Sequence, residues 1–280
     1  MHIQRRETPD GAQFVRREAD GTLRAIAPPG AGIREMLAGT RTHEETILDP
    51  ASRILPPLVP GKIVAIGLNY LDHIREAGVE PPTRPLIFAK FPSTVIADGD
   101  EIAFDPTVAK RVDWETELAV VIGSRARDVA EESALEHVFG YTIANDVSAR
   151  DLQFADGQWI RGKNLDSFCP LGPGIVTADE IVDPQALALR TRVNGRLVQD
   201  SSTAEMLFPV AALISYCSHL FTLEPGDVLL TGTPWGCGEF ASPPTHLDEG
   251  DAVVSEIEGI GTLTNRVRHR VQAVSGRSAA

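Results

Sequence analysis

Two acidic side chains stand at alternate positions just before an apolar run, and together they could bind a metal ion. Glu115 and Glu117 belong to the segment D-W-E-T-E, which leads into Leu118–Ile122. Side chains alternate between the two faces of a β-strand, so these carboxylates would share one face. Like charges so close repel each other unless a cation or a proton neutralises them. The pair therefore predicts a site for a hard divalent cation, Mg²⁺ or Mn²⁺ with Ca²⁺ as a further candidate, in preference to zinc. A solvated acidic face on an edge strand is the alternative.

A third acid follows the next apolar segment. Residues 138–144 predict a buried strand, and Asp146 stands at its end. Two carboxylates from one strand and one from a neighbouring strand could cover half an octahedron, which leaves positions for water or a chelating substrate. The alternative is that Asp146 caps a turn or a helix, a role that suits an Asn-Asp pair.

A histidine and a glutamate three positions apart form a second constellation. His73 and Glu76 would face each other if their segment is helical. A carboxylate beside an imidazole fixes its tautomer and raises its basicity, so this pair could activate water. An exposed histidine in a surface ion pair is the alternative.

Signatures of several other enzyme classes are absent from the sequence. There is no G-x-S-x-G elbow, H-E-x-x-H helix, Walker A loop or G-x-G-x-x-G turn. Cys169, Cys217 and Cys237 show no C-x-x-C spacing, which argues against a disulfide framework or a zinc site. Paired acids around a metal ion remain the best-supported chemistry.

Composition and charge limit the partners. The chain has 280 residues, of which 24 are Gly and 20 are Pro, and this predicts a turn-rich, β-dominated protein. A net charge of −13, with no block of Lys or Arg among aromatic residues, indicates that nucleic acid is not a partner. The N-terminus lacks an apolar secretion signal, and no apolar run approaches the roughly 20 residues that span a membrane. We therefore expect a cytoplasmic protein that acts on a small molecule, without a nucleic-acid or membrane partner.

Turn signals divide the chain into parts. A connector with three prolines at 55–61 predicts a boundary between a small N-terminal α/β domain, 1–60, and a larger domain, 61–270, followed by a flexible tail, 271–280.

The larger domain contains many short strands. Hairpin turns are predicted at Asp98-Gly99 and Asn194-Gly195. A helix is predicted from Ser202, which would form a capping box with Glu205, through Phe221. Many strands with few helices predict a mixed β (α+β) fold that closes or folds over on itself.

Six ordered segments resemble the fumarylacetoacetate hydrolase family, over the chain from about Lys62 to Val267. They are G-x-N-Y-x-D-H-x-x-E ending at Glu76, F-A-K-F-P-S at 88–93, D-W-E-x-E-L at 113–118, N-D-V-S-A-R-D-L-Q at 145–153, G-K at 162–163 and T-G-T-P at 231–234. The resemblance implies a mixed β-roll of the fumarylacetoacetate hydrolase type for the C-terminal domain, preceded by a small variable domain, and a homodimer.

The resemblance also implies roles for nine residues. The metal ligands would be Glu115, Glu117 and Asp146; the catalytic residues would be His73, Glu76 and Lys163; and the substrate would be held by Gln153, Thr233 and Lys90. The histidine and its glutamate would sit on a mobile lid.

The implied activity is metal-dependent cleavage of a C–C bond in a 2,4-dioxo acid, an acylpyruvate or a diketo sugar acid, through a metal-stabilised pyruvate enolate. His73 would deprotonate the attacking water. Two departures leave the substrate open: Leu68 stands where acylpyruvases of the family often have Arg, and the loop from Phe154 to Arg161 is short. Leu68 and the run from Gly162 to Pro173 are more similar to members that act on diketo sugar acids and to relatives that tautomerise oxaloacetate. The alternatives are therefore an oxaloacetate tautomerase or decarboxylase, or a related isomerase, and a non-catalytic binding protein, against which the full set of candidate residues argues.

Overall fold

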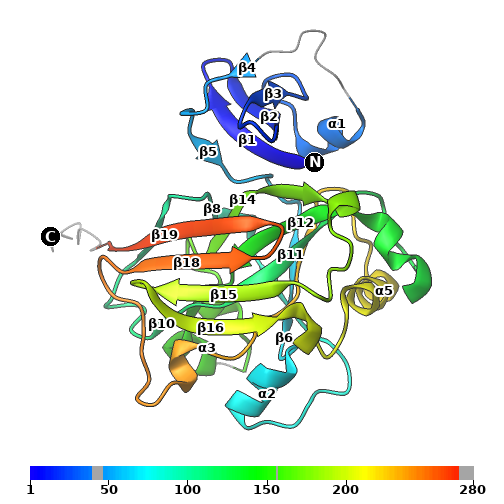
Figure 1. Ribbon diagram of the computed structural model, residues 1–280. Coiled ribbons are helices and arrows are strands. Elements are labelled where there is room, and N and C mark those ends of the chain that lie inside the picture. The colour runs from blue at the N-terminus through cyan, green and yellow to red at the C-terminus, as the bar shows by residue number, and fades with distance from the viewer. Residues whose placement is uncertain (40–46, 156, 271–280) are drawn as a thin grey trace, which may run out of the picture.

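The protein has two lobes, one above the other in Figure 1. The computed structural model describes residues 1–39, 47–155 and 157–270. The N-terminal strands, drawn in blue, form the smaller lobe, and the larger body lies below it. The predicted flexible tail, 271–280, lies outside the described residues.

A long mixed sheet runs through both lobes. Its strands are β1 (His2–Thr8), β2 (Gly11–Arg17), β3 (Leu23–Ala25), β4 (Ile47–Leu48), β5 (Ile54–Leu55), β6 (Ile63–Gly67), β7 (Leu86–Lys90), β8 (Val95–Ile96), β11 (Thr116–Ile122), β12 (Val138–Asn145), β14 (Cys169–Thr177) and β17 (Val228–Leu230). Within the described ranges the order is β4-β3-β2-β1-β14-β12-β11-β17-β6-β7, with β5 beside β1 and β8 beside β14. The β17–β6 and β14–β8 pairs are parallel, and the other pairs are antiparallel.

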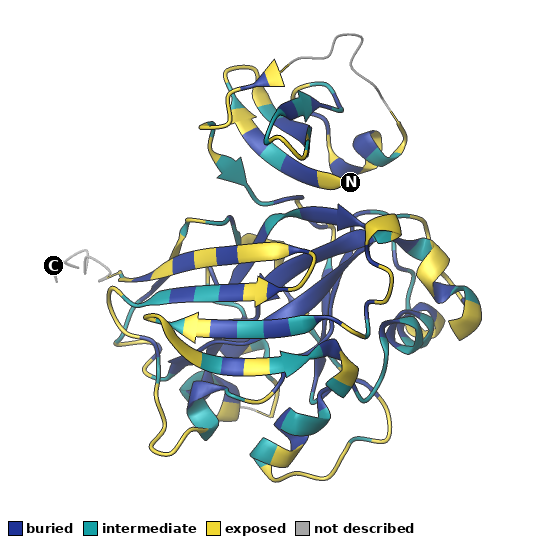
Figure 2. Ribbon diagram, in the orientation of Figure 1, coloured by how far each residue is buried: buried dark blue, intermediate teal, exposed yellow. Residues whose placement is uncertain are grey.

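A second sheet covers one face of this sheet in the body. Its strands are β9 (Glu101–Phe104), β15 (Ala188–Val193), β16 (Arg196–Ser202), β18 (Ala252–Ile257) and β19 (Gly261–His269), in the order β16-β15-β18-β19-β9. The residues of β11 are buried along its whole length, whereas those of β18 alternate in burial, as Figure 2 shows. The apolar residues between the two sheets, among them Leu118, Leu189 and Leu263, form one core. This sheet-dominated mixed fold confirms the expected class.

Short helices and a small ladder complete the body. The helices are α1 (Ile33–Leu37), α2 (Leu71–Ala77), α3 (Arg150–Ala155), α4 (Ile160–Lys163) and α5 (Val210–Leu220), with the 3₁₀ turns η1 (Pro92–Thr94), η2 (Glu131–His137), η3 (Ala178–Glu180), η4 (Thr203–Glu205) and η5 (Gly238–Phe240). The strands β10 (Val112–Asp113) and β13 (Ser148–Ala149) pair antiparallel. None of the helices in the described ranges is long and apolar enough to cross a bilayer.

The two lobes share their main sheet and a hydrophobic core. Strand β1 pairs antiparallel with β14, with Ile3 opposite Ile175. Ile3 and Phe14 belong to the same buried cluster as Leu171 and Ile175. The N-terminal lobe is therefore packed against the body through main-chain hydrogen bonds and apolar contacts, and the domain boundary near residue 60 stays a prediction.

The helix predicted from Ser202 begins later than expected. Ser202 caps only η4, and α5 starts after Pro209. The two residues before Pro209 donate their backbone N–H groups to Asn69, at 2.7 and 2.9 Å, instead of continuing a helix. Glu205 pairs with Arg75 at 2.9 Å, so the predicted capping box is wrong.

One of the two predicted hairpins is also wrong. The turn at Asp98-Gly99 separates β8 and β9, but β8 pairs with β14 and β9 pairs in parallel with β19. The Asn194-Gly195 hairpin is confirmed: β15 and β16 pair across it, with φ of 52° and 80° at the two turn residues. Both residues have the positive φ that a type I′ turn requires.

Candidate active site

Glu115 and Glu117 lie on one face of β11. Glu115 precedes the strand directly and Glu117 is its second residue. Thr116, between them, points the other way and hydrogen-bonds through its Oγ1 with Ser255 Oγ of the second sheet at 2.5 Å. The predicted alternation is therefore present. The two glutamates are only 6% and 1% exposed, so the solvated edge strand is wrong.

Asp146 joins the two glutamates from the end of β12. The strands β11 and β12 are neighbours, and the Asp146 N–H donates to the Glu115 carbonyl at 2.8 Å. One carboxylate oxygen from each of Glu115, Glu117 and Asp146 lies within 4.8 Å of the other two. We call these three residues the carboxylate cluster.

Basic side chains neutralise two members of the carboxylate cluster. Lys163 Nζ lies 2.7 Å from both Glu115 Oε2 and Asp146 Oδ2. Lys90 Nζ is 2.6 Å from Asp146 Oδ1, and Arg150 is 2.6 Å from Glu115 Oε1. All three basic residues are buried. Lys163 is buried, which disfavours its charge, but its carboxylate partners outweigh burial and raise its pKa.

Glu117 is the member of the cluster that has no ion pair within the described part of the chain. Its Oε2 accepts the Gly232 N–H at 2.7 Å. Burial raises the pKa of Glu117 well above its ordinary value, and the nearby Asp146 and Glu115 carboxylates raise it further. Burial acts on Glu115 in the same direction, but Lys163 and Arg150 outweigh it and lower the pKa of Glu115 to about 2.

The carboxylate cluster fits a hard divalent cation. It offers oxygen ligands from three separate side chains, which is the donor set that Mg²⁺, Mn²⁺ and Ca²⁺ prefer. Glu117 forms no ion pair with the described residues and its pKa is raised by burial, so a metal ion bound there would stabilise its carboxylate form.

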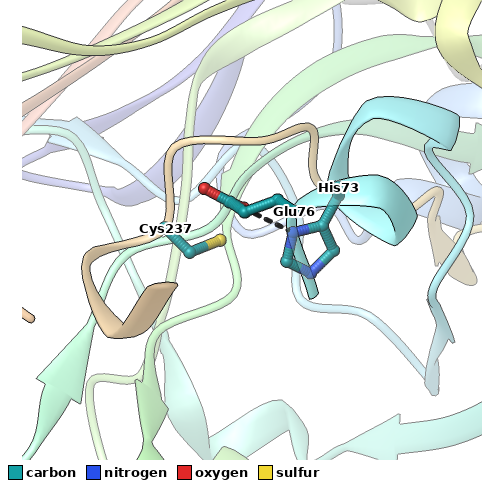
Figure 3. A group of neighbouring side chains, drawn as sticks. All are labelled: His73, Glu76 and Cys237. Atoms are coloured by element: carbon teal, nitrogen blue, oxygen red, sulfur yellow. Dashed lines mark hydrogen bonds and ion pairs between the residues drawn. The ribbon is translucent and has the colours of Figure 1, made fainter. Parts of the chain in front are cut away.

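The predicted histidine–glutamate pair lies on α2, and Figure 3 shows the two side chains facing each other. His73 Nδ1 is 3.0 Å from Glu76 Oε2, and Glu76 Oε1 accepts the Gly236 N–H at 2.8 Å. The His73 ring packs edge-on against Phe240, with centroids 5.3 Å apart. His73 is 7% exposed, so the exposed surface pair is wrong. Because Glu76 faces Nδ1, Nε2 is the ring nitrogen left for a ligand.

One cavity brings the histidine together with Glu115 and Glu117, two members of the carboxylate cluster. It has a volume of about 80 Å³. It is lined by Ile66, Gly67, Leu68, His73, Phe88, Glu115, Glu117, Arg150, Gln153, Phe154, Trp159, Lys163, Thr233 and Phe240. Helix α2 contributes His73 to this cavity, and the predicted mobility of its segment stays a prediction.

The three predicted substrate-binding residues lie at different depths. Gln153 lines the cavity and its Oε1 accepts from Arg150 at 3.0 Å, and no hydrogen bond from its amide N–H groups is found within the described residues. Thr233 also lines it, but its hydroxyl donates to the Thr116 carbonyl at 2.9 Å. Lys90 lies behind Asp146 and does not line the cavity. Their substrate-binding roles stay predictions.

Two buried residues that the sequence reasoning did not single out hold the site together. Arg150 joins Glu115 to Asp113, with 2.8 Å from its Nη2 to Asp113 Oδ2. Asp113 also accepts the backbone N–H groups of Gly238 and Glu239, at 2.8 and 3.1 Å. Both residues lie in motifs of the sequence, Asp113 at the start of D-W-E-T-E and Arg150 in N-D-V-S-A-R-D. Their spacing along the chain did not predict that they pair.

The three cysteines are free and buried. This fits the absence of a disulfide framework, and the cytoplasmic location stays a prediction.

Comparison with known proteins assigns this fold and site to a class. Residues 62–268 match the family model described as fumarylacetoacetate (FAA) hydrolase, C-terminal. The chain therefore belongs to the fumarylacetoacetate hydrolase family.

Several individual proteins are similar to this chain in sequence or in structure. A Xenopus laevis protein named oxaloacetate tautomerase fahd2, mitochondrial, is 50% identical over 218 residues, which are 77% of this chain and 68% of that protein. A solved fumarylacetoacetate hydrolase from Exiguobacterium antarcticum is 40% identical with a TM-score of 0.88, over 96% of this chain and 100% of that chain. A solved 2-hydroxyhepta-2,4-diene-1,7-dioate isomerase from Mycobacterium marinum is 39% identical with a TM-score of 0.82, over 96% of this chain and 99% of that chain.

Proposed function

We propose that this enzyme interconverts the enol and keto forms of oxaloacetate or a similarly small 2-oxo dicarboxylic acid, with Mg²⁺ or Mn²⁺ at the carboxylate cluster. The observation that carries the proposal is that His73 and the glutamates of the cluster line one cavity of about 80 Å³. Ligand pockets are commonly roughly 300–1,000 Å³, so this cavity suits a small, polar substrate.

Two of the similar proteins are named for an isomerisation, which supports proton transfer as the reaction. The Xenopus laevis relative is named a tautomerase, and the Mycobacterium marinum structure is titled an isomerase. Tautomerisation moves one proton and consumes no water.

The residues can move that proton as follows. Glu76 holds the His73 ring through Nδ1, so Nε2 takes a proton from C3 of the keto form and the C3–H electrons form the enolate. The enolate oxygen develops negative charge near the Lys163 ammonium, which favours the transition state over the neutral ketone. The protonated imidazole then returns the proton to that oxygen, which gives the enol. When bound, the metal ion would polarise the 2-oxo group and make C3–H more acidic.

Recognition of the substrate carboxylates falls to the remaining polar groups of the cavity. The Gln153 amide has donors left over, because its contact with Arg150 uses only its oxygen. Lys163 and Arg150 add positive charge at the cavity wall. The apolar rings of Phe88 and Phe240 also line the cavity.

Hydrolysis of a 2,4-dioxo acid is the second candidate, supported by the solved fumarylacetoacetate hydrolase of similar fold. In that reaction His73 would deprotonate a water, which attacks the 4-oxo carbon. The same residues serve both reactions, so the substrate decides between them.

A direct assay separates the two functions. Purified enzyme with Mg²⁺ is mixed with the enol form of oxaloacetate, and the loss of enol absorbance is compared with the uncatalysed rate and with the rate in EDTA. The same preparation is given acylpyruvates and a diketo sugar acid. We expect fast enol–keto exchange that needs the metal, with slow or no cleavage. Efficient cleavage without accelerated exchange would establish the hydrolase instead.

A further inference from the structure

We propose a second metal site, for Zn²⁺, formed by His73, Glu76 and Cys237, whose occupation switches off the proton-transfer pair. The proposal rests on the proposed function for its inhibitory effect, but not for the binding of the ion. No sequence pattern indicated this site, because Cys237 is far from the other two ligands along the chain. Its neighbour Gly236 donates to Glu76 from 160 positions away.

The geometry brings three different ligand atoms together. One ligand atom from each of His73, Glu76 and Cys237 lies within 4.8 Å of the other two. Figure 3 shows the Cys237 thiol on the loop beside α2, pointing toward the pair. Ligand atoms around one tetrahedral zinc lie roughly 3.4 Å apart at the usual bond lengths of about 2.0–2.3 Å, so movements of about an ångström would complete three bonds.

The ligand types separate this site from the carboxylate cluster. A thiolate, an imidazole and a carboxylate are all common zinc ligands, and three protein ligands with a water are a frequent zinc arrangement. The carboxylate cluster offers oxygen alone, which favours Mg²⁺ and Mn²⁺. The two sites would therefore take different ions from the same solution.

A larger groove gives access to the thiol side of the site. It has a volume of about 560 Å³, and Glu76, Gly236 and Cys237 are among its lining residues. His73 instead lines the smaller cavity with Glu115 and Glu117. The three ligands thus stand between two cavities, and an ion can reach them from the groove while the carboxylate cluster keeps its own metal.

Binding would consume the groups that catalysis needs. The Cys237 S–H bond breaks, a Zn–S bond forms, and the proton leaves to solvent. The proton on His73 Nδ1 moves to Nε2, and zinc takes the freed Nδ1 lone pair together with a Glu76 oxygen, which breaks the hydrogen bond that orients the ring. His73 then cannot take and return a substrate proton, so the enzyme is inhibited.

A cobalt titration tests binding without any turnover. Enzyme saturated with Mg²⁺ is titrated with Co²⁺, and the near-ultraviolet thiolate-to-cobalt charge-transfer band is followed. We expect the band in the wild type, its loss in Cys237→Ser and Cys237→Ala, and its retention in Cys217→Ser. Cys217 is a matched control, because it is also free and buried but lies on α5. No band in the folded wild type, or a band that persists in both Cys237 variants, would overturn the site.

Inhibition is then measured with Zn²⁺ in the presence of excess Mg²⁺. Loss of groups that only support metal ligands typically costs about 10–100-fold in affinity, so removing the thiol should raise the half-inhibitory Zn²⁺ concentration at least about tenfold. Cys217→Ser should leave it unchanged. Equal inhibition of wild type and Cys237→Ser would refute the inhibitory role. A failure of the proposed reaction would leave the cobalt result standing, so the two failures are distinguishable.

Discussion

At the scale of single residues, Glu117 is the member of the carboxylate cluster that forms no direct ion pair with the described residues. Its pKa is raised by burial and by Asp146 and Glu115. The folded protein therefore keeps a proton that the unfolded chain releases above about pH 4.5, and its stability falls as pH rises from there toward the folded pKa. The loss cannot exceed about 1.4 kcal/mol per pH unit for one group.

We predict that removing the metal exposes this dependence. In EDTA, thermal unfolding of the wild type should show a melting temperature that falls as pH rises above 4.5, and Mg²⁺ should restore more stability at pH 8 than at pH 5. In Glu117→Gln, the melting temperature should fall less steeply with rising pH, and Mg²⁺ should raise it much less than in the wild type. Glu115 does not contribute in this range, because its pKa is lowered to about 2 and its stabilisation is lost only as pH falls below about 4.5. A Mg²⁺ effect that is the same at both pH values would contradict the assignment.

The two members of the histidine–glutamate pair should differ in their effect on catalysis. His73→Ala removes the proton acceptor and should lower kcat for enol–keto exchange by about 10²–10⁴-fold. Glu76→Gln keeps an acceptor for the Gly236 N–H but loses the charge beside Nδ1, so its loss should be smaller. Stopped-flow assays give both values. Neither variant should change the Mg²⁺-induced shift in melting temperature; a lost shift would mean that the fold around the carboxylate cluster had changed.

At the scale of elements, close packing at the end of β6 shapes the cavity. A Cβ on Gly67 would lie 2.4 Å from the Trp159 ring, whereas one on Gly157 would meet nothing within 4 Å. Gly67→Ala should displace Trp159, lower the free energy of unfolding by roughly 1–3 kcal/mol and raise KM. Gly157→Ala, in the loop that carries Trp159, should change the free energy of unfolding by less than about 0.5 kcal/mol. Urea unfolding and tryptophan fluorescence measure both. Equal behaviour of the two variants would show that the packing of Trp159 against Gly67 does not shape the cavity.

The contacts within one element and between neighbouring strands of the site could be predicted from the sequence. Strand alternation placed Glu115 and Glu117 on one face, and the apolar segment before Asp146 placed it on the neighbouring strand. The helical spacing of His73 and Glu76 also predicted their contact. Each of these inferences depends on side-chain direction within one element, which periodicity determines.

The remaining parts depend on contacts between distant segments. The pairing of Arg150 with Asp113 and the approach of Cys237 to α2 are set by how the strands are ordered, which no local pattern encodes. The prediction that a helix begins at Ser202 was wrong because it, too, depended on a contact with a distant segment. Asn69, far away in the sequence, binds the backbone N–H groups just before Pro209.

At the scale of the whole molecule, the shared sheet predicts that both lobes unfold together. Ile3 is 1% exposed and pairs with Ile175 across the lobes. Ile3→Ala should lower the free energy of unfolding by roughly 2–5 kcal/mol and shift the whole calorimetric transition. The fully exposed Val182 provides the control, and Val182→Ala should stay within about 0.5 kcal/mol. A separate early transition in Ile3→Ala would show that the N-terminal lobe is an independent domain. The homodimer also stays a prediction at this scale.

The strand order has a consequence for biosynthesis. Three junctions of the two sheets, β1–β14, β6–β17 and β9–β19, join the early chain to the late chain, and hydrogen bonds beside them link residues 176, 165 and 166 positions apart. Pairings so distant must close large loops first, which slows folding. The first half of the chain, as it leaves the ribosome, carries open strand edges whose partners have not yet been made. Chaperone demand and aggregation during translation should therefore depend on the elongation rate of the second half, even though the finished protein has those edges paired.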